Sequence, residues 1–240
     1  CVKGYAAHEE KVFTEMARLR GEYERSKDLK AGSELYNKCN NILAIGEANP
    51  YLQASEQFLN LQKNLFIIKC KQVINMDIKV IKVGPLETNC YILTIENESI
   101  IIDPGDDFNK IKEAIGTNKV IGCLVTHFHQ DHIEALEEVV SHYDVEINKP
   151  KYGKFNYETI ETPGHTFDSK TFYFKDINTM FTGDFIFKSS IGRTDLGGND
   201  KDMIDSLENF KQYDDDITIY PGHGPKTTLG QEKINFIFYY

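Results

Sequence analysis

The sequence lacks several features that would place it in a familiar class. Its five cysteines form no CxxC pair, which predicts reduced thiols in a cytoplasmic protein and no disulfide framework. It has no apolar run of about 18 residues, so we expect no membrane span. Asp and Glu outnumber Lys and Arg by 37 to 27, and this net charge of −10 argues against nucleic acid as a partner. The GxSxG motif of a serine nucleophile is also missing.

The charge that is present is divided unevenly along the chain. Residues 1–75 carry 11 Lys and Arg against 9 Asp and Glu, a net charge of +2. Residues 76–240 carry 16 against 28, a net charge of −12. Up to residue 66 the apolar residues recur every three or four positions, as in helices, and residues 67–75 show neither helical spacing nor linker composition. We therefore predict a helical segment over 1–66, a junction over 67–75 and a separate domain over 76–240.

The segment that begins at Met76 has the pattern of a mixed fold. Alternating, Ile- and Val-rich stretches predict strands at 76–83 and 89–103. Further strands are predicted at 122–127, 170–174, 179–184 and 217–223, and helices at 132–143 and 201–210. Strands mixed with helices and tight Pro-Gly turns indicate an α/β or α+β sandwich.

The stretch THFHQDH concentrates polar side chains that a core cannot use. His127 and His129 are two positions apart at a predicted strand end, so their rings point the same way in extended backbone. Asp131 and His132 follow where the chain turns into a helix, and they can converge on the same point from another direction. Imidazole and carboxylate groups suit divalent metals such as zinc or iron.

Three more polar side chains follow predicted strands. They are His165 in TPGHT, Asp184 in FTGD and His223 in YPGHGP. Loops at strand ends gather functional groups, so we expect these residues to join the THFHQDH set. Of the seven histidines, only His8 and His142 then remain outside it. Six or seven ligands exceed the needs of one tetrahedral zinc and fit two metal ions that share a carboxylate.

Residues 76–240 resemble the metallo-β-lactamase superfamily, and within it the glyoxalase II-like (hydroxyacylglutathione hydrolase-like) branch of small hydrolases. The resemblance is carried by THFHQDH, TPGHT, FTGD and YPGHGP, together with GPLETNCYIL, IIDPGD and FKSSIGRTDLGG. It implies an α/β fold of the αββα sandwich type, with the site at one edge of two sheets.

The resemblance also implies a role for each candidate ligand. The first metal would be bound by His127, His129 and His165, the second by Asp131, His132 and His223, and Asp184 would bridge the two. Asp103 in IIDPGD matches an aspartate near the family's site. It either orients a ligand histidine or forms the turn before Pro-Gly.

These residues predict a hydrolase that uses two divalent metal ions. Zinc is the metal that we expect, and iron is the alternative. A metal-bound hydroxide, oriented by Asp131, would attack a small-molecule thioester or ester. A thiolate leaves without much protonation because thiol pKa values lie near about 8.5, so a thioester suits a site with no evident general acid.

Substrate contacts are less well defined by the sequence. Arg193 and Lys188 are candidates for binding an anionic substrate group, or they are solvated loop charges. Only 32 residues separate His132 from His165, fewer than is usual in the family. A helical extension like the one with which glyoxalase II holds glutathione does not follow His223. We therefore expect no glutathione specificity from the resemblance alone.

The N-terminal part resembles a different family. VKGYAAHEEKVFTEM and NNILAIGEANPYLQASEQFLNLQKNL are similar to LemA proteins over residues 2–65. Full LemA-like proteins carry an N-terminal membrane anchor, and this chain starts after that point, so we do not expect membrane attachment. Residues 1–75 are interpreted either as a functional module or as a neighbour joined by fusion or a misplaced gene boundary.

Two other functions stay open at this point. One is a single-iron oxidoreductase resembling persulfide dioxygenases, which the full set of seven ligands disfavours because those enzymes use fewer. The other is a LemA-like helical interaction protein that carries residues 76–240 as a passenger domain.

Overall fold

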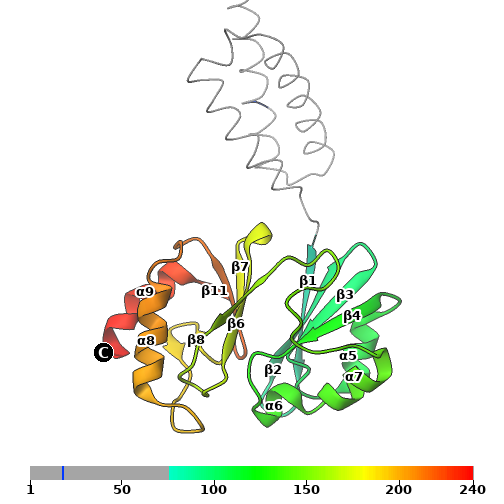
Figure 1. The fold of residues 1–240 in the computed structure, drawn as a ribbon, viewed down its shortest axis with the longest axis horizontal. Coiled ribbons are helices and arrows are strands. Elements are labelled where there is room, and N and C mark those ends of the chain that lie inside the picture. The colour runs from blue at the N-terminus through cyan, green and yellow to red at the C-terminus, as the bar shows by residue number, and fades with distance from the viewer. Residues whose placement is uncertain (1–17, 19–75, 240) are drawn as a thin grey trace, which may run out of the picture. The chain divides into compact units, whose positions relative to one another are not determined.

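The computed structural model describes Arg18 and residues 76–239 (Figure 1). The chain divides into two units, Cys1–Val73 and Ile74–Tyr240, and every element described below belongs to the second. The predicted helical segment and junction, residues 1–66 and 67–75, lie outside the described residues except for Arg18, which is helical.

The first sheet has four strands in the order β1-β2-β3-β4. They are β1 (Met76–Val83), β2 (Thr88–Ile95), β3 (Glu98–Ile102) and β4 (Lys119–Leu124). The first three are antiparallel, and β4 pairs parallel to β3 after a crossover through helix α5 (Phe108–Ile115). The predicted strand 76–83 is confirmed, and the predicted strand 89–103 is divided by a turn into β2 and β3.

The second sheet has five strands in the order β11-β10-β7-β6-β5. They are β5 (Glu158–Glu161), β6 (Lys170–Phe174), β7 (Thr179–Gly183), β10 (Thr218–Pro221) and β11 (Thr227–Thr228). Helix α8 (Asp200–Phe210) connects β7 to its parallel neighbour β10, and its N-cap Asn199 accepts a hydrogen bond from the Asp202 amide. A small hairpin, β8 (Ile186–Phe187) and β9 (Ser190–Ile191), follows β7.

The remaining elements are short helices. In the half of the domain that contains the first sheet, α6 (Gln130–Ile133) and α7 (Leu136–Tyr143) follow β4. The half that contains the second sheet has α9 (Leu229–Phe236) and the 3₁₀ turns η1 (Lys175–Ile177) and η2 (Ile237–Tyr239). In the part of the chain that the structure describes, no helix has the length and apolarity needed to cross a membrane.

Alternation along the strands builds three layers of core. On β2, Cys90 and Ile92 pack with residues of α5 and α7, whereas Tyr91 and Leu93 point to the opposite face. That opposite face meets the second sheet through Phe172 and other aromatic side chains. The outer face of the second sheet packs against α8 and α9. The order is therefore helices, sheet, sheet, helices, which confirms the predicted αββα sandwich (Figure 1).

The strand predicted at 122–127 was placed too late in the chain. β4 begins at Lys119 and ends at Leu124. It ends there because the next two backbone N–H groups donate to side chains: Val125 to Asn148 Oδ1 at 2.8 Å and Thr126 to Asp103 Oδ1 at 2.8 Å. His127 and His129 therefore lie in a loop beyond the strand.

The helix predicted at 132–143 is broken into α6 and α7. The Glu134 and Ala135 amides donate to the carbonyls of Gly105 and Pro104, each at 3.0 Å, so a turn of the first sheet takes up groups that a continuous helix would use. The sequence did not predict α5, α9 and β5. The two helices are only eight residues long each and the strand only four, so each gives too short a pattern to recognise.

Phe181 tests the packing between the two sheets. Its ring is fully buried and lies 4.9 Å from Tyr91 and 5.3 Å from Tyr220 between ring centroids. We expect Phe181→Ala to lower the free energy of unfolding by about 3–5 kcal/mol, measured by urea denaturation of the full chain. Phe238→Ala is the matched control, since that ring is 78% exposed, and it should change stability by less than about 0.5 kcal/mol. Equal losses in the two variants would contradict this assignment of the core.

Candidate metal centre

All seven predicted ligands meet at one edge of the two sheets. The first sheet supplies the loop after β4, with His127 and His129, and then α6, with Asp131 and His132. The second sheet supplies the other three from the turn after β5 and the ends of β7 and β10, namely His165, Asp184 and His223. The side chains form three overlapping groups whose nitrogen and oxygen atoms lie within 4.8 Å of one another.

Neighbouring strands explain why residues far apart in sequence converge here. β7 and β10 are parallel, and Gly183 pairs with Pro221 across the irregular end of the ladder. Asp184 and His223 therefore leave the sheet from adjacent positions. A direct backbone hydrogen bond of 2.8 Å from Gly222 to Gly183 holds these two strand ends together.

Three histidines form the first group. His129 Nδ1 lies 3.2 Å from His127 Nε2 and 2.8 Å from His165 Nε2. Four ligands placed tetrahedrally around a zinc ion at 2.0–2.1 Å are about 3.3 Å apart, so the spacing of these nitrogens is close to that of a metal site.

Asp131, His132 and His223 form another group. Asp131 Oδ2 lies 3.2 Å from His223 Nε2 and 3.6 Å from His132 Nε2. The Thr88 hydroxyl donates to the same oxygen at 2.9 Å and fixes the direction of the carboxylate.

Asp184 lies between the groups. Its Oδ1 is 3.2 Å from His132 Nε2, and its Oδ2 is 3.6 Å from His165 Nε2 and 3.5 Å from His223 Nε2. The two oxygens of one carboxylate thus face histidines of both the first group and the Asp131 group.

The far ring nitrogens of three histidines are held by backbone carbonyls. His129 Nε2 lies 2.9 Å from the Leu196 oxygen and His165 Nδ1 lies 2.6 Å from the Arg193 oxygen. His223 Nδ1 lies 3.2 Å from the Leu86 oxygen. A carbonyl only accepts hydrogen bonds, so these nitrogens are donors, and the other nitrogen of each ring is the one left to bind a cation.

The remaining two histidines are held through Asp103. Its Oδ2 accepts from His132 Nδ1 at 3.0 Å and from the Thr126 hydroxyl at 2.7 Å. Because the Thr126 hydroxyl donates to Asp103, its oxygen is left to accept from His127 Nδ1, which is 3.1 Å away. In all five imidazoles the outer nitrogen is therefore the one held by the protein, and the inner nitrogen is the one that can bind a metal, as in metal-binding histidines.

Asp103 fits both interpretations from the sequence, as a residue that orients a histidine and as a turn residue before Pro-Gly. It is buried, it contacts His132, and its φ of 52° begins the Pro-Gly turn. The aspartate thus connects a turn of the first sheet to a histidine of the centre.

The electrostatics of the centre call for positive charge. Burial lowers the pKa of His132, but Asp103 and Asp184 outweigh it and raise that pKa to about 10. Burial, and then the charge of His132, lowers the pKa of His127 to about 2. For Asp131 burial raises the pKa, yet the hydrogen bond with His223 and the charge of His132 bring it well below its usual range. The carboxylates of Asp131 and Asp184 are therefore ionised. They hold a proton on His132, and a bound metal ion would take the place of that proton.

Two buried atoms test whether a metal ion fits. Among the described residues, His132 Nε2 and Asp184 Oδ1 are the buried side-chain nitrogen and oxygen atoms that make no hydrogen bond. Buried polar atoms without partners cost about 1–3 kcal/mol each. The two atoms lie 3.2 Å from each other within the cluster, and both are of a type that binds metals. The residues present therefore fit a divalent cation.

Arg193 and Lys188, the two residues predicted to contact substrate, have exposed side chains that are not part of the cluster. Arg193 is exposed, and its Nε and a terminal nitrogen donate to the two oxygens of Asp195, each at 2.6 Å. Lys188, directly after β8, is also exposed. The contribution of Arg193 to the centre is its carbonyl, which holds His165.

Sequence reasoning missed several residues that support the centre. Leu86 and Leu196 act through backbone carbonyls, for which a sequence carries no side-chain signal. Thr88 and Thr126 act through hydroxyls, and Thr88 lies within GPLETNCYIL, so that motif offered a signal.

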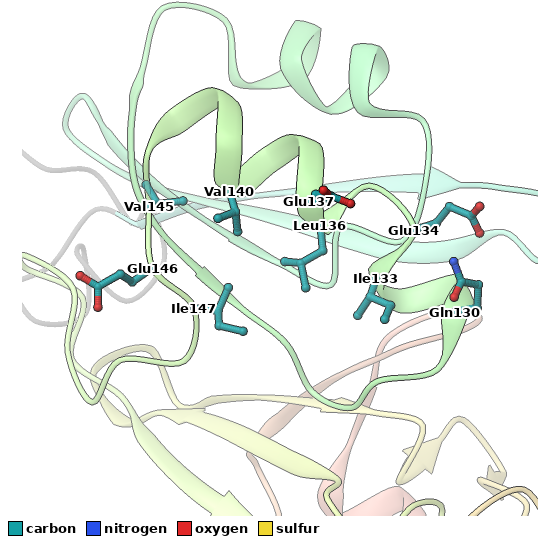
Figure 2. Close-up of a pocket in the computed structure, with 9 residues that line it drawn as sticks. All are labelled: Gln130, Ile133, Glu134, Leu136, Glu137, Val140, Val145, Glu146 and Ile147. Atoms are coloured by element: carbon teal, nitrogen blue, oxygen red, sulfur yellow. The ribbon is translucent and has the colours of Figure 1, made fainter.

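A separate surface groove of about 680 Å³ lies beside α6 and α7 (Figure 2). It is lined by Gln130, Ile133, Glu134, Leu136, Glu137, Val140, Val145, Glu146 and Ile147. None of the seven predicted ligands lines it, so the groove borders the helix that carries Asp131 and His132 without adding to the cluster.

Comparison with known protein families agrees with both halves of the sequence reading. The profile of the metallo-beta-lactamase superfamily matches residues 83–155 and 153–223, and that of the LemA family matches residues 1–74. A probable metallo-hydrolase of Bacillus subtilis, YqgX, is 31% identical over 193 residues, which cover 63% of this chain and 92% of that protein. The hydroxyacylglutathione hydrolase GloC of Haemophilus influenzae is 31% identical over 204 residues, covering 66% and 95%.

Solved structures show the same fold. The B3 metallo-beta-lactamase BLEG-1 superposes with a TM-score of 0.63 at 27% identity, covering 68% of this chain and 99% of that one. TTHA1623 in a di-iron-bound form superposes with a TM-score of 0.60 at 26% identity, covering 64% and 96%.

Gly222 tests the tight packing of the cluster. A Cβ at this position would lie 2.2 Å from Asp184 Oδ1 and 2.6 Å from His132 Cε1. We expect Gly222→Ala to displace both side chains, to shift their imidazole NMR signals and to lower stability by about 1–3 kcal/mol. Glu113→Ala is the control, because Glu113 is exposed on α5, and it should leave both the imidazole signals and the stability unchanged. Unchanged imidazole signals in Gly222→Ala would contradict the geometry described above.

Proposed function

Because the chain belongs to the metallo-beta-lactamase superfamily, we propose that residues 76–240 form a hydrolase that uses two divalent metal ions to cleave a thioester or a small ester. The name of the relative GloC, a hydroxyacylglutathione hydrolase, supports a thioester as the bond that is cleaved. The coverage of 92–95% of both relatives means that the similarity extends over nearly their whole lengths.

The observation that carries the proposal is the orientation of the five imidazoles. Each donates from its outer nitrogen to a protein oxygen and turns its other nitrogen toward the cluster. Five inner nitrogens then converge with the carboxylates of Asp131 and Asp184, and this set of atoms suits divalent cations.

In this proposal the ligands are divided as the family resemblance implies. His127, His129 and His165 bind one ion, Asp131, His132 and His223 bind the other, and Asp184 bridges them. Five nitrogens and two carboxylates suit zinc, and iron is the alternative that the di-iron form of TTHA1623 supports.

Bound divalent ions would supply the chemistry that the side chains lack, by lowering the pKa of a water molecule toward neutrality and polarising a carbonyl group. Asp131 is ionised, and its Oδ2 is fixed by Thr88, so the carboxylate can accept a hydrogen bond from the attacking water and orient it. A thiolate leaving group needs little protonation, since thiol pKa values lie near about 8.5. The reaction therefore requires no general acid in the cluster.

The division of the chain at residues 1–66, 67–75 and 76–240 is part of the proposal. The LemA family profile over residues 1–74 supports a separate origin for the first part. We assign the hydrolysis to the second part alone, because all seven proposed ligands belong to it.

Removing a ligand tests the proposed function. We expect the full chain to bind about two zinc or iron ions and to hydrolyse simple acyl thioesters. His129→Ala and Asp184→Ala should lower metal content and reduce kcat/KM by more than about a hundredfold, because losing even a supporting partner of a ligand costs 10–100-fold. Metal analysis and a thioester assay check both results.

His142→Ala is the matched control for these variants. His142 is an exposed histidine of α7 whose ring packs on Phe108, at 5.3 Å between ring centroids, and not on the cluster. Its metal content and activity should equal those of the unmodified chain. Full thioester hydrolysis by protein stripped of metal with a chelator would refute the proposal.

A second variant tests the support given by Asp103. Asn also tolerates a φ of 52°, so Asp103→Asn changes the charge and one acceptor without adding backbone strain. Its amide group would face the Thr126 hydroxyl and His132 Nδ1, both donors, and metal affinity should fall about 10–100-fold. Competition with a chromogenic chelator measures this, and Asp77→Asn, at an exposed position of β1, serves as the control. Equal affinities would show that Asp103 acts only as a turn residue.

A further inference from the structure

Three exposed apolar residues lie next to the histidines of the polar centre. Leu86, Phe167 and Leu196 are 63%, 80% and 50% exposed, and we call these three residues the apolar rim. Single exposed apolar residues are ordinary on protein surfaces, but several of them beside one polar centre are typical of ligand binding.

Hydrogen bonds hold each residue of the rim close to the histidines, directly for Leu86 and Leu196 and through Gly197 for Phe167. The Leu86 carbonyl accepts from His223, and the Leu196 carbonyl accepts from His129. Phe167 lies two residues after His165, and its amide donates to the Gly197 oxygen at 3.1 Å, which places it beside Leu196. These contacts fix the backbone of each rim residue next to a proposed ligand.

The rim flanks the centre on two sides. Leu86 comes from the turn between β1 and β2, on the side of His223. Phe167 and Leu196 come from the second half of the chain, on the side of His129 and His165. The half-buried ring of Phe187, 6.1 Å from the ring of His223 between centroids, adds apolar surface on the first side.

The charges near the rim do not favour an anionic ligand. Arg193, three residues before Leu196, is paired with Asp195 through two hydrogen bonds, so the loop contributes no net positive charge from this pair. Residues 76–240 carry a net charge of −12, which two divalent ions would change only to −8, and this charge disfavours glutathione, whose two carboxylates outnumber its one ammonium group. Chemistry and charge thus agree on the kind of molecule that fits.

We propose that the substrate of this centre is an uncharged thioester or ester with an apolar acyl group, and that Phe167 and Leu196 determine this specificity by covering that group. The inference rests on the proposed hydrolase function and adds the class of substrate to it. It separates this chain from a glutathione thioester hydrolase, because the discriminating contacts are apolar.

Kinetics on matched substrates test the inference. Acetyl, butanoyl and hexanoyl thioesters of N-acetylcysteamine are neutral and differ only in acyl length, and the hexanoyl thioester of glutathione adds the charged thiol. For the metal-loaded full chain we expect kcat/KM to rise about twofold per methylene. This corresponds to half the free energy of burying a methylene completely, because the rim stays partly exposed. The glutathione thioester should react more slowly than its neutral counterpart.

Substitution of the rim separates packing from chemistry. Phe167→Ala should remove most of the dependence on acyl length, so that kcat/KM on the hexanoyl thioester falls toward that on the acetyl thioester. Phe238→Ala, whose ring is exposed to a similar 78%, should keep the full dependence on length. A Phe167→Ala enzyme with an unchanged length dependence would overturn the role of the rim, as would faster cleavage of the glutathione thioester that is lost in Lys188→Ala.

A binding measurement distinguishes failure of this inference from failure of the proposed function. Calorimetric titration with neutral thioethers that cannot be hydrolysed, S-ethyl-, S-butyl- and S-hexyl-N-acetylcysteamine, places the varied chain on the sulfur, where the acyl group of the substrate is. Affinity should rise with chain length in the unmodified chain and not in Phe167→Ala. That result without any thioester hydrolysis would keep the rim and refute the hydrolase. Hydrolysis with affinity and kcat/KM independent of length would keep the hydrolase and refute the rim.

Discussion

The structure of the centre depends on hydrogen bonds made by the outer nitrogens of five imidazoles. Each such bond fixes the orientation of a ring and makes its outer nitrogen the donor, so the inner nitrogen is left to bind a cation. The partners are the carbonyls of Leu86, Arg193 and Leu196, together with Asp103 and Thr126. Any change that moves one of these loops therefore changes the cluster, even where no ligand is altered.

The αββα sandwich makes this arrangement possible by meeting at one edge. One sheet delivers THFHQDH and Asp103, while the parallel ends of β7 and β10 deliver Asp184 and His223. The three core clusters hold the sheets in register, and the cost of burying Asp103 beside His132 is offset by three hydrogen bonds to its carboxylate. Packing and polar chemistry are thus supported by the same strand ends.

The reaction and the substrate are encoded in different parts of the site. The polar centre, whose residues fit divalent metal ions, carries the proposed chemistry, hydrolysis assisted by metal ions. The loops that hold its histidines also carry Leu86, Phe167 and Leu196, whose side chains are exposed. A loop can thus keep its carbonyl in place for a histidine while its side chain varies, which lets one reaction serve different substrates.

The sequence alone determined the candidate ligands and the class of the fold, because both are local. Four candidate ligands lie within the single stretch THFHQDH, and the other three follow strand-turn motifs. The alternation along β2 and β3 is also visible in the sequence. The end of β4 at Leu124, the break between α6 and α7, and the carbonyls behind three histidines were decided by tertiary structure. These depend on Asn148, on the turn at Pro104 and Gly105, and on loops distant in sequence. A backbone oxygen is the same in every residue, so only the folded chain shows which one meets a histidine.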